Sequence, residues 1–427
     1  MAKGKREIGI RFYGGAREIG GSCIELSLPD GRRVLLDCGG KFKKDGRTVY
    51  PEIEKPEKID IAFLSHPHAD HSLGFLHARQ IGLNCPIITT EMTKQTSVVT
   101  FCDAHKLEVE REEEPRFTYG KIAQVLNLMK TDRSRGQFEG LSYKLFPAGH
   151  IPGAVAAYLG YGHKSILYTG DINNNETRLV AERGKLPHAD VLIIDCTYGN
   201  RLHPDREKTE QDFRQMIEGT VAGNGCVVIG AFAVARSPEI LLLLTEINPD
   251  CPIYVDGMPR DIVKVYLENI QYLKNRDLEK IRGQVRFVSG SNHRRYVANM
   301  RPAIVVASGG MLNGGAILHY AKAVAPDEKS VLALTGYQVE GTNGRRALEE
   351  GRIEINGEVI DLKCSVRRFS FSTHLDSDGI KKTIVEVMPK LVIAQHGDEQ
   401  SVRAVVKMAR NLNIKAIAPA IGERIIV

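Results

Sequence analysis

Residues 65–72 read Ser-His-Pro-His-Ala-Asp-His-Ser, so three imidazoles and one carboxylate stand within six residues. Imidazole and carboxylate together suit a borderline divalent ion such as Zn²⁺, and the lack of cysteine in the cluster disfavours a closed structural zinc site. Pro67 has no amide hydrogen and restricts the residue before it, so we predict a loop that aims His66 and His68 at one ion while Asp70 and His71 face another. The alternative is a histidine-rich surface turn, which the density of ligands argues against.

Short apolar runs that end in a polar or ionisable residue recur along the chain. Such runs are typical of buried strands. They cover residues 59–64 before His66, 165–168 before Asp171, 191–194 before Asp195, 304–307 before Ser308, and 391–394 before His396. We expect these strand ends to converge on one site.

Helical patterns lie between the runs, as in Ile262, Tyr266, Ile270 and Leu273, which follow one another at four- and three-residue steps. Alternating strands and helices predict an α/β protein. Near the amino terminus, residues 8–16, 21–26 and 32–40 are closely spaced strand candidates separated by glycines, which favours a locally antiparallel sheet. The sequence therefore predicts a mixed sheet with helices packed outside.

Six motifs in order identify a known pattern. HPHADH at 66–71 is followed by AGHIPGA around His150, YTGDI around Asp171, DCTYG around Asp195, FSTHLD around His374 and AQHGDE around His396. The chain resembles the β-CASP family of metallo-β-lactamase-fold ribonucleases over nearly its whole length. It is most similar to the archaeal cleavage and polyadenylation specificity factor nuclease-like proteins that lack KH domains.

The resemblance implies two metal ions, expected to be Zn²⁺ with Mn²⁺ as an alternative. The first ion would be bound by His66, His68, His150 and Asp171. The second would be bound by Asp70, His71, Asp171 and His396. Asp171 would then bridge two ions about 3.5 to 4 Å apart, the spacing at which a pair of metals can hold a hydroxide nucleophile and neutralise a phosphate oxygen.

The resemblance also assigns catalytic roles to Asp70, His374 and Asp195. The Asp195 carboxylate would orient His374 so that this imidazole protonates the leaving oxygen, a role suited to a group that titrates near neutral pH. The alternative is that His374 only hydrogen-bonds the substrate phosphate while Asp195 supports a metal ligand.

The implied fold is an αββα metallo-β-lactamase sandwich with an inserted Rossmann-like β-CASP domain. We expect the sandwich to comprise residues 1–200 and 365–427, and the insertion to comprise residues 201–364. An insertion of this length is large enough to form a compact lobe. In the family it caps the metal site, and the cleft would admit one nucleic-acid strand.

Two glycine-containing turns of the insertion are candidates for phosphate binding, because each stands where a strand passes into a helix whose backbone amides can receive an anion. The first begins at Gly230 and includes Arg236, and the second contains Ser308, Gly309 and Gly310. Ser372 is a further candidate by resemblance. The alternative is that these are tight turns that simply need glycine.

Composition adds only weak constraints. A formal net charge of +6 is compatible with a polyanionic partner without requiring one. No apolar stretch is long enough to span a bilayer, and the 8 cysteines form no CxxC pair, so we expect free thiols, a cytoplasmic location and no membrane partner. The resemblance implies single-stranded RNA as the partner and a homodimer formed through carboxyl-terminal strands.

The expected function is zinc-dependent, mainly endonucleolytic cleavage of phosphodiester bonds in single-stranded RNA, in RNA processing or decay. One alternative is a 5′-3′ exoribonuclease of the RNase J type. The others are a small-molecule hydrolase on the same metal scaffold and an inactive scaffold of an RNA-processing complex. Inactive family members lose metal ligands, whereas every ligand position is filled in this chain.

Overall fold

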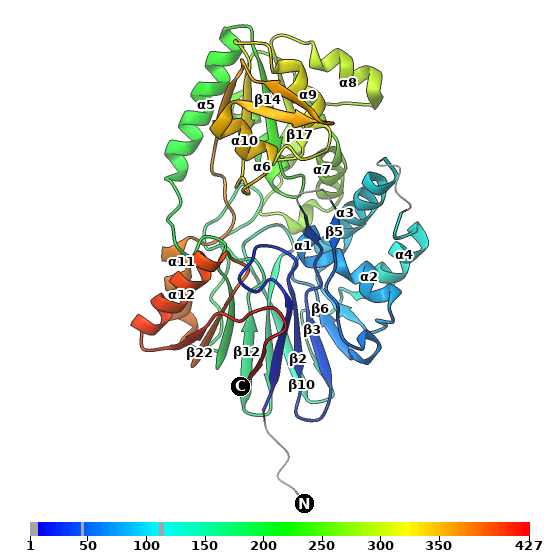
Figure 1. Cartoon of the computed structure of the whole chain (residues 1–427), viewed down its shortest axis with the longest axis vertical. Coiled ribbons are helices and arrows are strands. Elements are labelled where there is room, and N and C mark those ends of the chain that lie inside the picture. The colour runs from blue at the N-terminus through cyan, green and yellow to red at the C-terminus, as the bar shows by residue number, and fades with distance from the viewer. Residues whose placement is uncertain (1–6, 44–46, 111–114) are drawn as a thin grey trace, which may run out of the picture. The chain divides into compact units, whose positions relative to one another are not determined.

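The computed structural model describes residues 7–43, 47–110 and 115–427 (Figure 1). The chain divides into two compact units. The first unit comprises Met1–Glu176, Val180–Leu202 and Thr373–Val427, and the second comprises Thr177–Leu179 and His203–Ser372. The chain therefore enters the second unit from the middle of the first and returns to it.

The first unit contains two seven-stranded mixed sheets. The first sheet has the order β24 (Arg424–Ile426), β1 (Gly9–Gly14), β2 (Cys23–Ser27), β3 (Arg33–Leu36), β6 (Ile61–Phe63), β7 (Ile87–Ile88) and β8 (Met129–Lys130). The strands β1, β2 and β3 are antiparallel neighbours, with Ile24 opposite both Phe12 and Leu36. This confirms the antiparallel arrangement predicted near the amino terminus, and β3, β6, β7 and β8 continue the sheet in parallel.

The second sheet has the order β23 (Lys415–Ile417), β22 (Leu391–Gln395), β13 (Val191–Asp195), β12 (Lys164–Tyr168), β11 (Val155–Tyr161), β10 (Leu141–Pro147) and β9 (Arg135–Phe138). The strands β12, β13, β22 and β23 are parallel, so their carboxyl ends meet at one edge. Four of the five predicted runs coincide with β6, β12, β13 and β22. His66, Asp171 and His396 follow the carboxyl ends of β6, β12 and β22, and Asp195 is the last residue of β13.

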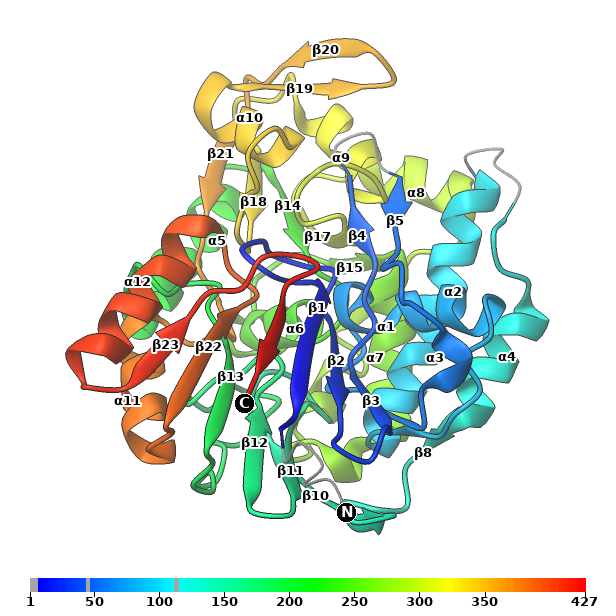
Figure 2. The ribbon, with the colours of Figure 1, turned by 60° about the horizontal axis from the view of Figure 1, so that its bottom comes forward.

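The two sheets pack face to face, because one apolar cluster contains residues of both, such as Phe12, Leu36, Leu159 and Ile193. Helices cover the outer faces (Figure 2). The first sheet is covered by α1 (Ala69–Ser72), α2 (Gly74–Gln80), α3 (Glu91–Glu110) and α4 (Tyr119–Leu128), and the second by α11 (Ser377–Val387) and α12 (Glu399–Asn411). The first unit is therefore an αββα sandwich. A short hairpin of β4 (Lys41–Phe42) and β5 (Thr48–Val49) and the 3₁₀ turn η1 (Pro56–Lys58) follow β3.

The second unit contains a six-stranded parallel sheet. Its order is β16 (Val285–Phe287), β15 (Ile253–Asp256), β17 (Ala303–Ser308), β14 (Cys226–Ala231), β18 (Val331–Leu334) and β21 (Ser365–Arg368). Its central strands are buried on both faces, which explains why they read as unbroken apolar runs, the fifth predicted run among them.

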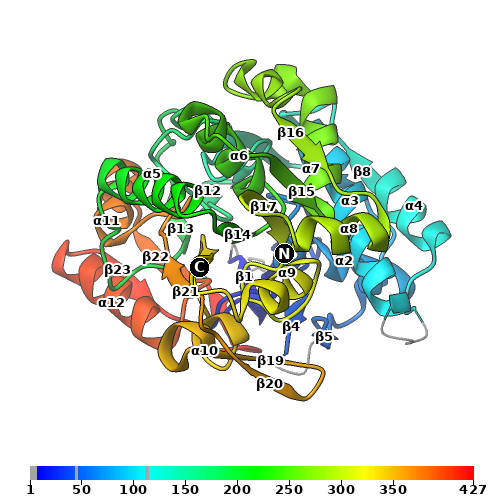
Figure 3. The same cartoon turned by 90° about the horizontal axis from the view of Figure 1, so that it is seen from above.

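Helices lie on both faces of this sheet, with α6 and α7 on one side and α9 on the other (Figure 3). The helices are α5 (Arg206–Ala222), α6 (Arg236–Ile247), α7 (Met258–Glu268), α8 (Gly290–Ala298), α9 (Ile317–Val324) and α10 (Asn343–Glu350), with 3₁₀ turns η2 (Ile270–Tyr272) and η3 (Asp277–Ile281) and the hairpin β19 (Arg352–Ile355) with β20 (Glu358–Asp361). The predicted α/β class is thus confirmed, and the second unit has the doubly wound arrangement expected of the insertion.

One predicted helix is shorter than its pattern. The apolar spacing from Ile262 continued to Leu273, but α7 ends at Glu268 and Ile270 begins a separate 3₁₀ turn. The backbone of Asn269 leaves the helical conformation at φ −119° while its amide still bonds the carbonyl of Val265.

All 8 cysteines are free, as predicted. Within the described segments, no helix combines the length and the apolar character needed to cross a bilayer.

Candidate metal centre

The predicted metal-ligand loop follows β6 directly. Residues 64–68 are loop, as Pro67 predicted, and α1 then carries Asp70 and His71 on a single short helical turn. The preceding strand is fully buried, so the imidazoles of His66 and His71 enter the interior and are 0% exposed.

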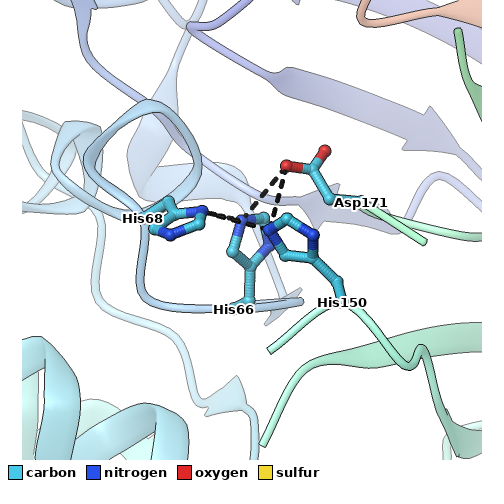
Figure 4. Close-up of side chains that lie close together, drawn as sticks. All are labelled: His66, His68, His150 and Asp171. Atoms are coloured by element: carbon cyan, nitrogen blue, oxygen red, sulfur yellow. Dashed lines mark hydrogen bonds and ion pairs between the residues drawn. The ribbon is translucent and has the colours of Figure 1, made fainter. Parts of the chain in front are cut away.

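The first group of ligand atoms joins this loop to the ends of β10 and β12 (Figure 4). Nδ1 of His68 lies 3.0 Å from Nε2 of His66 and 3.2 Å from Nε2 of His150. Oδ2 of Asp171 lies 3.4 Å from Nε2 of His66 and 3.6 Å from Nε2 of His150. Four donor atoms of two chemical types therefore face one point.

The second group lies on the other side of Asp171. Oδ1 of Asp171 is 3.2 Å from Nε2 of His71 and 3.4 Å from Nδ1 of His396. Nε2 of His396 is 3.3 Å from Nε2 of His71 and 3.4 Å from Oδ2 of Asp70. The two oxygens of Asp171 thus face different groups, which is the arrangement expected of a bridging carboxylate.

Electrostatics distinguish the two groups. Burial lowers the pKa of His66 and His150 and lowers that of His68 to about 3, so these imidazoles are neutral and keep the lone pairs that a metal needs. Burial also lowers the pKa of His71, but the carboxylates of Asp171 and Asp37 outweigh it and raise this pKa to about 10. The second group is therefore a place where positive charge is strongly favoured.

In three of the ligand imidazoles, the ring nitrogen that faces away from the centre contacts another residue. Nδ1 of His150 donates to the carbonyl of Thr373 at 2.8 Å, and Nδ1 of His71 lies 2.7 Å from Oδ2 of Asp37. Nδ1 of His66 lies 2.9 Å from the hydroxyl of Ser65. Such contacts fix the imidazole orientation and leave Nε2 directed at the centre.

Two residues of the site have left-handed backbone conformations. Asp37 has φ 54° and His396 has φ 53°, although neither is glycine. This conformation costs a side-chain-bearing residue roughly 1–2 kcal/mol, and such residues concentrate at functional sites. The amide of His396 donates to the carbonyl of Gly15 at 2.7 Å, which holds the imidazole at the end of β22.

The donor set fits divalent metal ions. Oδ1 of Asp171 is buried and accepts no hydrogen bond from the described residues, although a buried carboxylate oxygen normally has a partner. Burial raises the pKa of Asp171, but the surrounding imidazoles, His396 foremost, hold it well below its ordinary value, so the carboxylate is ionised. A cation on each side of this carboxylate would satisfy both its charge and its free oxygen.

His374 and Asp195 form a pair beside the metal ligands. Nδ1 of His374 lies 2.8 Å from Oδ2 of Asp195, whose other oxygen accepts from the amide and hydroxyl of Thr197 at 2.8 and 2.6 Å. Burial lowers the pKa of His374, but Asp195 and Asp171 outweigh it and hold the pKa above its ordinary value. The imidazole retains 20% side-chain exposure while Asp195 has 1%, so His374 is the member of the pair that a ligand can reach.

The structure brings all seven predicted metal ligands and the His374–Asp195 pair into one part of the first unit. Ser308, Gly309, Gly310, Arg236 and Ser372 belong to the second unit. There, Ala231 at the end of β14 pairs with Ser308 at the end of β17, and Gly310 packs against Phe232. The two glycine turns therefore lie side by side at the carboxyl edge of the parallel sheet, where ligands of such sheets bind.

The sequence interpretation missed Asp37, which is fully buried behind His71. Besides His71, its carboxylate accepts from the hydroxyl of Tyr168 at 2.6 Å and from the amide and hydroxyl of Ser65, both at 2.6 Å. The signal was present, because Asp37 directly follows the apolar strand β3, much as Asp195 stands at the end of β13.

Family models match three parts of the chain: the beta-lactamase superfamily domain at residues 32–221, the Beta-Casp domain at 239–347, and the Zn-dependent metallo-hydrolase RNA specificity domain at 359–419. Three proteins of similar sequence each align with more than nine-tenths of this chain.

"Probable RNase MJ4" of Methanocaldococcus jannaschii is 38% identical over 97% of this chain and 99% of that protein. "RNase aCSPSF2" of Saccharolobus solfataricus is 32% identical over 97% of this chain and 85% of that protein. "Transcription termination factor FttA" of Methanosarcina mazei is 30% identical over 92% of this chain and 67% of that protein. A crystal structure of a protein of unknown function from Enterococcus faecalis V583 superposes with a TM-score of 0.60 at 16% identity, covering 99% of this chain and 100% of that one, which supports the fold alone.

Proposed function

Since the chain belongs to the β-CASP family of metallo-β-lactamase-fold nucleases, we propose that it cleaves single-stranded RNA endonucleolytically with two zinc ions. Membership of this family makes the chain a hydrolytic nuclease of RNA processing with a divalent-metal site. The observation that carries the proposal is the position of Asp171, whose two oxygens face two separate groups of ligand atoms. Mn²⁺ is the alternative ion, because the same nitrogen and oxygen donors bind it.

Each residue of the centre has a proposed role. His66, His68 and His150 would hold one ion, and Asp70, His71 and His396 the other, with Asp171 shared between them. Two such ions activate a water molecule and offset the charge that develops on a phosphate during hydrolysis. The leaving oxygen still needs a proton, and a side chain of the protein must supply it.

His374 is proposed to deliver that proton. Asp195 lies 2.8 Å from Nδ1 of the imidazole, so we assign the proton to be donated to the other ring nitrogen, Nε2. Transfer from Nε2 to the leaving ribose oxygen would prevent the formation of an unstable alkoxide. Asp195 keeps the imidazole protonated until that moment.

Phosphates of the substrate are proposed to bind the second unit at Ser308, Gly309, Gly310, Arg236 and Ser372. The support is the pair of adjacent turns after β14 and β17, because each leads from the carboxyl end of a parallel strand into a helix. Single-stranded RNA is the proposed substrate, since its successive phosphates can bind at such turns one after another.

We also propose a cytoplasmic homodimer. The free cysteines are typical of a reducing compartment. The carboxyl-terminal strand β24 is the edge strand of its sheet, and Ile426 on it is 52% exposed, so a second copy could extend the sheet there. Light scattering of the purified protein would report the mass of two chains, and a single-chain mass would refute the dimer.

The test uses 5′-labelled and internally labelled single-stranded RNA, with and without a chelator. Internal fragments that disappear on chelation support the proposal, whereas mononucleotides alone would indicate the 5′-3′ exonuclease. No cleavage by metal-loaded protein would favour an inactive scaffold, and turnover of small esters without RNA cleavage would favour a small-molecule hydrolase.

Variants assign the roles within the same assay. Asp70→Ala should lose activity together with one ion. His374→Ala should keep both ions and lose roughly 10²- to 10⁴-fold in kcat. His163→Ala, at an exposed hairpin turn between β11 and β12, is the matched control and should behave as wild type.

A further inference from the structure

A surface hollow of about 710 Å³ lies in the first unit between the β4–β5 hairpin and the glycine-containing segment after β1. Its size is within the range typical of ligand pockets, roughly 300–1,000 Å³. The hairpin runs beside α1, the short helix that carries Asp70 and His71 (Figure 2). None of the lining residues is a metal ligand.

Glycines at the wall of this hollow and beside it lie against Asp70, a residue of the metal centre. Gly21 and Gly39 line it. A side-chain carbon on Gly39 would lie 1.7 Å from the carbonyl oxygen of Asp70, and one on Gly20 would lie 3.4 Å from Cβ of Asp70. The hollow is therefore separated from the second ligand group by little more than the backbone of one ligand.

Aromatic side chains give the hollow its apolar surface. Phe42, Tyr50 and Tyr13 line it, and Phe42 is 58% exposed, more than any other phenylalanine of the chain. The adjacent Val49 is 42% exposed. An exposed aromatic face beside a reaction centre is suited to stacking on a planar ligand, and nucleobases of every sequence offer such a face.

The charges of the hollow favour an anionic chain. Lys41 and Lys43 both line it, and Glu18 pairs with Lys41. Lys43 is exposed and contributes the net positive charge of these three groups. A cation next to a stacking surface is the combination that binds single-stranded nucleic acid, because one group meets the phosphate while the other meets the base.

We propose that this hollow binds a nucleotide close to the bond that is cut, with its base stacked on Phe42 and its phosphate beside Lys43. The inference rests on the proposed ribonuclease function and adds a substrate-binding subsite to it. Binding there does not depend on which base is present, because stacking makes no hydrogen bonds to the edges of a base. The subsite lies wholly within the first unit, so it serves the metal centre independently of the phosphate turns of the second unit.

The test measures the affinity of the metal-loaded protein for a fluorescein-labelled phosphorothioate oligoribonucleotide that resists cleavage. Phe42→Ala should weaken binding about 5- to 150-fold, and Phe42→Tyr should restore it, since loss of one stacked base has an effect of that size. Lys43→Ala should reduce the slope of log affinity against log salt by about 0.7, as expected for one lost phosphate contact on a single strand. Val385→Ala, an exposed apolar position on α11, is the matched control.

Hydrolysis of bis(p-nitrophenyl) phosphate provides a second readout, because this diester carries no flanking nucleotide to occupy the proposed subsite. It should be unchanged in Phe42→Ala and Lys43→Ala. Unchanged RNA affinity in both variants, or a Phe42→Ala protein whose only defect is a lower mass in light scattering, would overturn the subsite. The latter result would identify Phe42 as a contact between protein chains.

The two proposals fail differently. If wild-type protein cleaves RNA and Phe42→Ala binds it equally well, the subsite falls and the ribonuclease function stands. If wild-type protein binds RNA through Phe42 without cleaving it, the subsite stands and the proposed catalysis falls.

Discussion

The imidazole of His71 is held by the buried carboxylate of Asp37, with 2.7 Å between Nδ1 and Oδ2. The opposite nitrogen, Nε2, is thereby directed at Oδ1 of Asp171, 3.2 Å away. Asp37 is itself fixed by Tyr168 and Ser65. The Asp37 carboxylate thus orients the His71 imidazole, and the imidazole in turn faces the proposed ion site. The position of each group depends on the group that contacts it.

Replacing Asp37 should weaken metal binding without removing a ligand. In Asp37→Asn the side chain keeps its size but loses the charge that orients His71, and we expect roughly 10- to 100-fold lower affinity for one of two zinc ions. Competition with a chromogenic chelator measures this affinity. Asp256→Asn, at a buried carboxylate of the second unit, should leave it unchanged. Equal affinities in both variants would mean that Asp37 does not support the site.

Gly39 should tolerate no side chain. Its Cβ would lie 1.7 Å from the carbonyl oxygen of Asp70, so Gly39→Ala must displace the backbone that carries Asp70 and His71. We expect a loss of about 3 kcal/mol or more in the free energy of unfolding, together with loss of one ion. Urea denaturation compares the variant with Gly184→Ala, where a side chain would meet nothing within 4 Å. A wild-type midpoint for Gly39→Ala would show that the loop adapts freely.

Asp195 should set the alkaline limit of activity. Burial lowers the pKa of His374, and the carboxylate of Asp195 is the strongest of the effects that raise it. A general acid is active while protonated, so activity is lost as pH rises through this pKa. Removing the charge in Asp195→Asn lowers the pKa, and the falling limb of the kcat profile should move to lower pH. An unmoved limb would exclude His374 as the proton donor.

Glu210 should stabilise the second unit only above acidic pH. Burial raises its pKa, but Arg178, with contacts of 2.7 and 2.8 Å, and Arg206 outweigh burial and lower the pKa to about 2. Because the folded pKa lies below its ordinary value of 4.5, the stabilisation is full above pH 4.5 and is lost as the pH falls toward 2.

Glu210→Gln should therefore lower the free energy of unfolding by about 1–3 kcal/mol at pH 7. The difference from wild type should shrink as the pH falls below the unfolded pKa, which denaturant titrations at several pH values can follow. Glu218→Gln on the same helix removes an exposed partner at 3.9 Å and should have little effect. A difference that does not change with pH would refute the assignment of the stabilisation to this carboxylate.

The metal-ligand loop could be predicted from the sequence because its ligands are close together in the chain. His66, His68, Asp70 and His71 stand within six residues, and Pro67 excludes a regular helix at its own position. Asp171, Asp195 and His396 were predictable for another reason, since each follows an apolar run and the carboxyl ends of β12, β13 and β22 meet at one edge of the sheet.

Other features required the packed structure. Asp37 looks like any aspartate after a strand until β3 is placed beside β6, which brings it to His71 and Ser65. The early end of α7 depends on the turn at Asn269, which the apolar spacing does not record. Phe42 appears in the sequence as an ordinary apolar residue, and only its exposure sets it apart.

The most direct test of the central claim is a metal titration of RNA cleavage. Protein stripped by a chelator is given Zn²⁺ in fractional equivalents, and bound metal and the rate of internal cleavage are measured on the same samples. We predict no cleavage without metal and a full rate only when two ions are bound per chain. Full-rate cleavage by protein that holds no divalent metal would contradict the claim.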